Sequence, residues 1–136
     1  MKITQLKNIG VVPPRELNFK DPFTEELTDI FFTVHPLKSK YGKEAEHKMR
    51  LRIVELMQDE SNIVEVDGKK NLNQDLILEE TVAMIANMVS DWKGIEDDKG
   101  KAIKFSEDKC IELLKEYQSL ADAIYVFSSN MGNFQE

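Results

Sequence analysis

The chain has 136 residues, of which 41% are hydrophobic, and its formal net charge is −7. This composition is too apolar for a disordered chain and fits one domain with a single core. The negative charge disfavours general nucleic-acid binding through phosphate contacts, and no apolar run reaches the roughly 20 residues that span a membrane. The single cysteine cannot form an internal disulfide, and the N-terminus lacks a signal-peptide pattern, so we expect a soluble cytoplasmic protein.

The first part of the chain is predicted to form an arm followed by a β-hairpin. Residues 1–14 include Pro13-Pro14, which restricts the backbone to extended forms, and we expect a flexible or extended N-terminal arm. Residues 15–37 alternate apolar and polar side chains, turn at Asp21-Pro22 and return through a segment rich in β-branched and aromatic residues. This pattern predicts a β-hairpin.

The predicted hairpin leaves one question open. An isolated two-stranded hairpin is only marginally stable, so it must pack on a helix or pair with another chain. Its unpaired edge is therefore a candidate partner-binding surface, with Phe31 as a candidate contact residue. Coverage of this edge by the protein's own elements is an equally good interpretation.

A basic helix is predicted at residues 38–57. Ala45, Met49 and Ile53 recur at helical spacing, and Gly42 weakens the first turn by roughly 1 kcal/mol relative to alanine. The basic side chains Lys48, Arg50 and Arg52 have two interpretations. They either neutralise acidic neighbours on a solvated face or bind an acidic segment of a partner. The loop that follows contains the turn dipeptide Asp67-Gly68 and is predicted to form a loop or a small hairpin.

The most apolar long segment predicts a central helix at residues 73–93. Its apolar side chains recur in alternating steps of four and three, which is typical of one helix face: Leu78, Val82, Ile85, Val89 and Trp92. Gly94 follows at the position where a left-handed residue would end the helix. Asp98-Lys99-Gly100 is then predicted to form a tight reversal in which the glycine has a positive φ.

Two further helices are predicted at residues 106–134, the first with Ser106 as its N-cap. The residues predicted to form the structural core are Val82, Ile85, Val89, Trp92, Leu114 and Ile124. We therefore predict an α+β fold, mainly α, in which an N-terminal β-hairpin packs on a small bundle of about four helices. Residues 15–136 are expected to form a single domain.

No catalytic, cofactor or metal site is predicted. His35 and His47 lie on different predicted elements, and no second cysteine or histidine stands at metal-ligand spacing. Cys110 lies on an apolar stripe without a motif that supplies a base. Glu96-Asp97-Asp98 does not match the calcium-binding loop pattern. Since no acid, base or nucleophile constellation can be assembled, we predict a protein that is not an enzyme.

The C-terminal segment SSNMGNFQE is polar with single apolar residues. It is either a frayed tail or a partner-binding extension that carries Phe134. The sequence does not choose between these two interpretations.

Several segments resemble a block found in small tail assembly chaperones of long-tailed bacteriophages of the lambdoid or siphophage type. The block has three parts: a helix that ends in W-x-G-hydrophobic, an acidic turn that contains glycine, and the sequence hydrophobic-x-F-S/T, which opens another helix. In this chain the three parts are VSDWKGI at 89–95, DKGK at 98–101 and IKFS at 103–106. The likeness continues through LLKEY at 113–117 and LADAI at 120–124, although Gln118 stands where proline is common. It covers residues 78–134, with a weaker likeness over 15–57.

The resemblance implies a non-enzymatic protein of the infected bacterium's cytoplasm that is absent from the mature virion. Its implied partners are the phage tape measure protein, whose apolar helices it keeps soluble, and the tail tube protein, whose subunits it helps recruit. Self-association also remains open, and the resemblance implies neither a nucleic-acid nor a membrane partner. Exposed methionine would suit such binding, because its side chain adapts to varied apolar surfaces.

Two other functions remain open. One is a structural tail or head–tail connector subunit that stays in the virion. The other is a small acidic regulator or inhibitor of a host protein.

Overall fold

The computed structural model describes residues 1–6 and 12–135, so part of the predicted N-terminal arm, residues 7–11, lies outside the described residues. The elements in chain order are α1 (Ile3–Leu6), β1 (Arg15–Lys20), β2 (Leu27–Val34), α2 (Lys40–Leu56), the 3-10 turn η1 (Glu60–Asn62), β3 (Ile63–Val66), β4 (Lys69–Leu72), α3 (Gln74–Ala86), β5 (Val89–Lys93), α4 (Glu107–Glu116), α5 (Gln118–Ser129) and the 3-10 turn η2 (Met131–Phe134).

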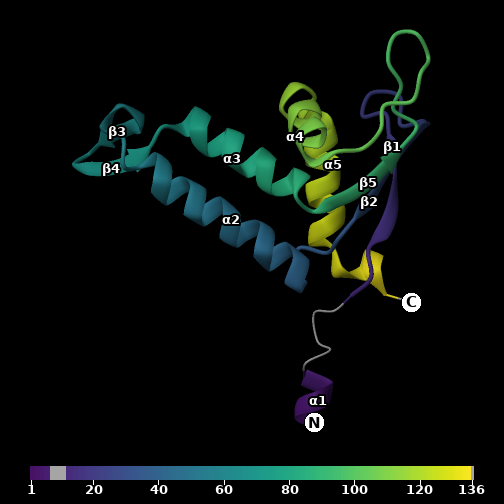
Figure 1. Ribbon diagram of the computed structural model, residues 1–136, viewed down its shortest axis with the longest axis horizontal. Helices are drawn as coiled ribbons and strands as arrows, with labels where there is room; N and C mark the ends of the chain where they lie inside the picture. The colour runs from purple at the N-terminus through teal and green to yellow at the C-terminus, as the bar shows by residue number, and fades with distance from the viewer. Residues whose placement is uncertain (7–11, 136) are drawn as a thin grey trace.

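A three-stranded antiparallel sheet forms the centre of the molecule. Its strand order is β1-β2-β5, so a strand from the middle of the chain extends the N-terminal pair. Arg15 lies opposite Val34 in the first pair, and Phe32 lies opposite Trp92 in the second. Helix α5 contacts β1 and β2, and α4 packs against α3 (Figure 1).

The predicted fold of a hairpin on about four helices is wrong. The described residues contain five helices and five strands in two sheets, with 48% of residues in helices and 22% in strands. The second sheet is the two-stranded pair β3-β4. The difference arises because β1 and β2 do not stand as a separate hairpin: they share their sheet with β5.

The predicted helix at residues 73–93 is also wrong beyond Ala86, where α3 ends and β5 soon begins. The pairing of β5 with β2 shifts register between Thr33 and Val34, which leaves Ser90 as an extra residue on β5. Such a bulge lets two residues three apart face the same side of a sheet. Val89 and Trp92 are both buried for this reason, and their spacing imitates that of a helix face.

Gly94 accordingly ends a strand and not a helix. It has a φ of +86°, and a Cβ at this position would lie 1.8 Å from the carbonyl oxygen of Asp29. Two other local predictions are confirmed. Gly100 has a φ of +80° in the reversal, and the side chain of Ser106 caps α4 by accepting from the backbone N–H of Lys109.

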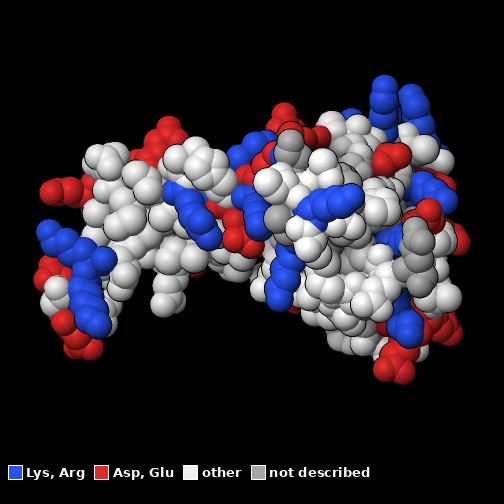
Figure 2. Space-filling model, turned by 90° about the horizontal axis from the view of Figure 1, so that it is seen from below, with Lys and Arg blue, Asp and Glu red and all other residues white. Residues whose placement is uncertain are grey.

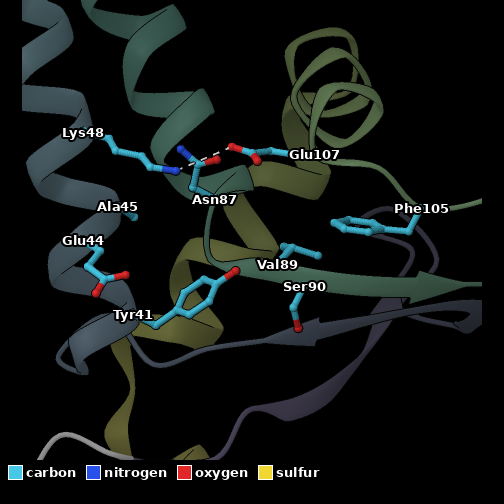
Figure 3. A pocket seen from close by; sticks show the side chains of 9 residues that line it. All are labelled: Tyr41, Glu44, Ala45, Lys48, Asn87, Val89, Ser90, Phe105 and Glu107. Carbon is cyan, nitrogen blue, oxygen red and sulfur yellow. Dashed lines mark ion pairs between the residues drawn. The ribbon is translucent and has the colours of Figure 1, made fainter.

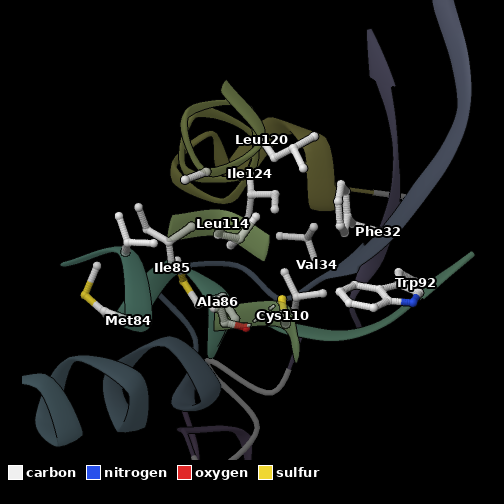
Figure 4. Close-up of a cluster of buried hydrophobic side chains, with 14 of the residues drawn as sticks. Phe32, Val34, Met84, Ile85, Ala86, Trp92, Cys110, Leu114, Leu120 and Ile124 are labelled. Carbon is white, nitrogen blue, oxygen red and sulfur yellow. Dashed lines mark hydrogen bonds between the residues drawn. The ribbon is translucent and has the colours of Figure 1, made fainter. Parts of the chain in front are cut away.

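The hydrophobic core lies between the sheet and the helices α3, α4 and α5. Every residue that the sequence predicts as core is buried. Figure 4 shows side chains converging from β2, α4 and α5: Phe32, Val34, Cys110, Leu114, Leu120 and Ile124. Trp92 is 8% exposed and packs edge-to-face against Phe32 and Phe105. Its indole Nε1 donates to the carbonyl oxygen of Ile103 at 2.8 Å, which ties β5 to the segment before α4.

Replacing Trp92 tests the importance of this contact. Trp92→Ala removes a buried ring, and we expect the free energy of unfolding to fall by about 3–5 kcal/mol. Trp92→Phe retains most of the apolar contact but leaves the carbonyl of Ile103 without its donor, so we expect a smaller loss of about 1–3 kcal/mol. Urea denaturation measures both, and equal losses in the two variants would show that the hydrogen bond and not the ring dominates.

Candidate functional site

Helices α2 and α3 form an αα-hairpin that projects from the rest of the molecule (Figure 1). We use this name for residues 40–86, which include β3 and β4 at the far end of the two helices. The backbone N–H of Asn73 donates to the carbonyl oxygen of Asn62 at 2.7 Å, which closes the β3–β4 end. The αα-hairpin is thus a thin extension with large surface on both sides.

The base of the αα-hairpin is fixed by a tight turn. The Ser39 hydroxyl donates to the carbonyl oxygen of Pro36 at 2.6 Å and accepts from the backbone N–H of Gly42 at 3.2 Å. Gly42 is needed here because a Cβ would lie 2.0 Å from the carbonyl oxygen of Leu37. This close approach sets how α2 leaves the sheet, and it explains a glycine that helix propensity alone disfavours.

Gly42→Ala is therefore expected to have two opposing effects on stability. Alanine favours the helix by about 1 kcal/mol, but its methyl group would collide with backbone that has little room to move. We expect a net loss of about 1–3 kcal/mol in the free energy of unfolding, measured by urea denaturation. The control is Lys43→Ala at the exposed neighbouring position, where we expect a change within about 0.5 kcal/mol. Stabilisation by Gly42→Ala would contradict the tight contact.

Exposed apolar side chains gather on the αα-hairpin. They come from both helices and from the small sheet: Leu51, Val54, Met57, Val64, Val66, Ile77 and Leu78. Leu51 is 57% exposed and Val54 is 58% exposed, one helical turn apart on α2. Figure 2 shows uncharged surface along this extension, with charged groups at its tip and near the body. Single exposed apolar residues are common, but a group of this size is typical of an interaction surface.

The exposure follows from the thinness of the extension. Each helix of the αα-hairpin buries one stripe against the other. Helices α4 and α5 cover the C-terminal half of α3, but among the described residues no third layer covers the outer part of the αα-hairpin. In the small sheet, Ile63 and its cross-strand partner Leu72 face inward, while Val64 and Val66 project from the other face. Sequence analysis missed these residues. Leu51 and Val54 lie outside the stripe of Ala45, Met49 and Ile53, and this excess of apolar residues was the available signal.

The predicted basic residues are all paired with carboxylates. Lys48 lies 3.9 Å from Glu107, Arg50 lies 3.4 Å from Glu46, and Arg52 lies 3.4 Å from both Glu55 and Glu80. The Arg52–Glu80 pair connects α2 with α3. These pairs favour the interpretation of a face that neutralises acidic neighbours, and each exposed pair contributes about 0–1 kcal/mol.

The two phenylalanines proposed as contacts occupy different environments. Phe31 is half-buried on the sheet face away from α5, with the Nζ of Lys93 at 4.9 Å from its ring centroid. Phe134 is buried and packs against Phe127 with ring centroids 5.4 Å apart. The C-terminal turn η2 therefore contributes its aromatic ring to the core, and this ring does not project as a binding group.

A polar pocket lies where α2, β5 and the start of α4 meet (Figure 3). Its volume is about 240 Å³, and the residues of the Lys48–Glu107 ion pair both line it. The Oδ1 atom of Asn87, a lining residue, is buried without a hydrogen-bond partner in the part of the chain that the structure describes. The pocket is smaller than most small-molecule sites.

The only cysteine in the sequence, Cys110, lies buried in the core. Burial raises the pKa of the Cys110 thiol to about 12, which keeps it protonated and unreactive at neutral pH. No group of three His, Cys, Asp or Glu side chains is placed to hold a metal ion among the described residues. No described helix is both long and apolar enough to cross a membrane.

His35 stacks on Tyr41 at the base of the αα-hairpin, with ring centroids 3.7 Å apart. Burial lowers the pKa of His35 below the usual value of about 6.5. As the pH falls through about 6.5, the unfolded chain binds a proton at this site before the folded chain does. Folding stability should therefore decrease over this range.

We expect the free energy of unfolding to decrease more between about pH 7.5 and about pH 5.5 in the wild type than in His35→Gln. Urea denaturation at each pH measures the difference. His47→Gln, at an exposed position on α2, is the control and should retain the wild-type slope. If His35→Gln kept the wild-type slope, His35 would not be the source of the pH dependence of stability.

The chain matches a known protein family. A family model described as "YdaY prophage protein" matches residues 38–136. No curated protein and no solved structure matches the chain.

Proposed function

The chain belongs to the YdaY prophage protein family, which makes it a phage-derived protein, and from this premise we propose that it is a tail assembly chaperone. The bacteriophage origin implied by the sequence resemblance is thereby confirmed. In the proposed function, the chain binds the tape measure protein without catalysis and helps recruit tail tube subunits. It acts in the cytoplasm of the infected bacterium and is absent from the mature virion.

The observation that supports this proposal is the apolar surface of the αα-hairpin. A chaperone for apolar helices needs exposed apolar side chains on a surface that a helix can reach. Leu51 and Val54 on α2, with Leu78 on α3, supply such side chains away from the central sheet. Helix recognition commonly uses apolar anchors at this spacing. The methionines contribute less than expected, because Met84 and Met88 are buried in the core.

The electrostatics are consistent with binding through apolar contacts. Lys48, Arg50 and Arg52 already have carboxylate neighbours, so an acidic partner segment would have to displace them. We therefore assign the main contact to the apolar side chains and leave the charges a role in encounter and orientation.

The test is co-expression with the tape measure protein encoded by the same prophage. We expect the wild type to raise the soluble fraction of that protein several-fold, and Leu51→Lys combined with Val54→Lys to abolish the gain. Phe23→Lys is the matched control, because Phe23 is 94% exposed in the turn between β1 and β2, outside the αα-hairpin. Circular dichroism and thermal unfolding show whether each variant is folded.

A tape measure protein that is equally insoluble with and without the chain would overturn the proposal. Loss of activity in Phe23→Lys to the same extent as in the double variant would remove the αα-hairpin as the contact surface. Abundant chain in purified virions, measured by mass spectrometry, would instead identify a structural subunit of the particle.

A further inference from the structure

The outer edge of β1 is open. In the sheet order β1-β2-β5, strand β1 pairs with β2 on one side, and no strand of the described chain pairs with its other side. An open edge presents unpaired backbone groups that can hydrogen-bond to another strand. This edge lies beside an apolar groove of about 460 Å³ between β1 and α5.

Two hydrogen bonds show which backbone groups point outward. The carbonyl oxygen of Phe19 accepts from the Thr28 hydroxyl at 2.7 Å, and the N–H of Asp21 donates to the carbonyl oxygen of Glu26 at 2.8 Å. Both groups therefore face the β2 side. Because successive residues of a strand direct their backbone groups to opposite sides, Glu16, Asn18 and Lys20 direct theirs to the open edge.

We propose that a second copy of this chain pairs with the open edge of β1, antiparallel and with Asn18 at the two-fold axis. An isologous pair of this kind requires each outward residue to meet an outward residue of the second copy. Only the register centred on Asn18 uses all three outward residues of β1. If the centre shifts to Leu17, Lys20 lies opposite Pro14. Proline cannot donate a backbone hydrogen bond to Lys20, because its side-chain ring occupies the backbone nitrogen.

The side chains agree with this register. Within the chain, the Oε1 atom of Glu16 lies 3.1 Å from the Nζ atom of Lys93. The register places this Glu16 opposite Lys20 of the second copy as well, and the symmetry repeats this pair of opposite charges on the other side of the axis. Arg15 lies opposite Asp21 in the same way. Charged residues normally protect an open edge from pairing, but opposite charges directly across two strands attract. The charges of β1 therefore select a second β1 strand over an unrelated one.

The groove supplies the apolar part of the interface. Leu17 and Phe19 line it from β1, and Ala123, Val126 and Phe127 line it from α5. In the proposed register Leu17 lies opposite Phe19 of the second copy, so apolar side chains meet on the face that α5 covers. Val126 is 68% exposed on that face and becomes covered as the two α5 helices approach. Burial of this surface would drive the association.

Asn18 gives a separate reason for the position of the axis. Its Oδ1 atom is buried and has no hydrogen-bond partner among the described residues of the single chain. A buried polar atom without a partner costs free energy, so an unsatisfied amide in a native structure requires an explanation. At the two-fold axis the Asn18 amide lies beside its counterpart, and a small rotation of both side chains lets each amide donate to the other.

Sedimentation of the full chain and a charge exchange test the proposal. We expect a wild-type particle of twice the 15.7 kDa chain mass. Lys20→Glu places like charges across the interface at two symmetric positions. We expect it to raise the dissociation constant of the dimer about tenfold or more. Adding Glu16→Lys to this variant restores opposite charges and should restore dimerisation. A monomeric wild type, or a dimer unaffected by Lys20→Glu, would overturn the proposal.

Cross-linking gives a second measurement that does not depend on charge. In a hydrogen-bonded antiparallel pair the two Cα atoms are about 5.5 Å apart, which a disulfide can span. Asn18→Cys should therefore form a covalent dimer under mild oxidation, whereas the native Cys110 is buried. The control is Asp91→Cys on β5, at the opposite edge of the sheet. Cross-linking of Asp91→Cys but not of Asn18→Cys would place the interface on the β5 edge of the sheet and overturn the proposal.

Discussion

The pairing of β5 with β2 is the constraint on which the rest of the structure depends. This pairing turns an N-terminal pair of strands into a three-stranded sheet and brings the chain from α3 directly into the core. The bulge at Ser90 directs both Val89 and Trp92 inward, and the indole of Trp92 then holds the segment before α4 through Ile103. Helix α4 then packs against α3, and α5 packs against β1 and β2.

Because α3 enters the core only with its C-terminal half, its N-terminal half and most of α2 extend from the body. Two helices and a two-stranded sheet cannot cover all of their own apolar side chains, so Leu51, Val54 and Leu78 remain exposed. The same architecture that gives a well-packed body thus leaves an apolar extension. At its base, the close approach of Gly42 to the backbone of Leu37 fixes where α2 begins.

The sheet and the αα-hairpin present different kinds of surface. The open edge of β1 offers directed backbone hydrogen bonds and a fixed pattern of charges, which suits a strand of defined register. The αα-hairpin offers apolar side chains without fixed polar partners, which suits helices of varied sequence. Since the two surfaces lie on different elements, self-association through β1 would leave the αα-hairpin accessible to another protein (Figure 1).

The sequence by itself determined the local features of this protein: the strand segments of β1 and β2, the cap at Ser106, the positive φ of Gly100, the buried core positions and the phage likeness. Only the tertiary structure decided the state of residues 89–93, because a spacing of three suits both a helix and a bulged strand. Residues 89–93 form a strand because the edge of β2 offers backbone hydrogen bonds to them. Tertiary packing also buried Phe134 against Phe127 and left Leu51 exposed, since burial depends on which elements meet and not on the hydrophobicity of one residue.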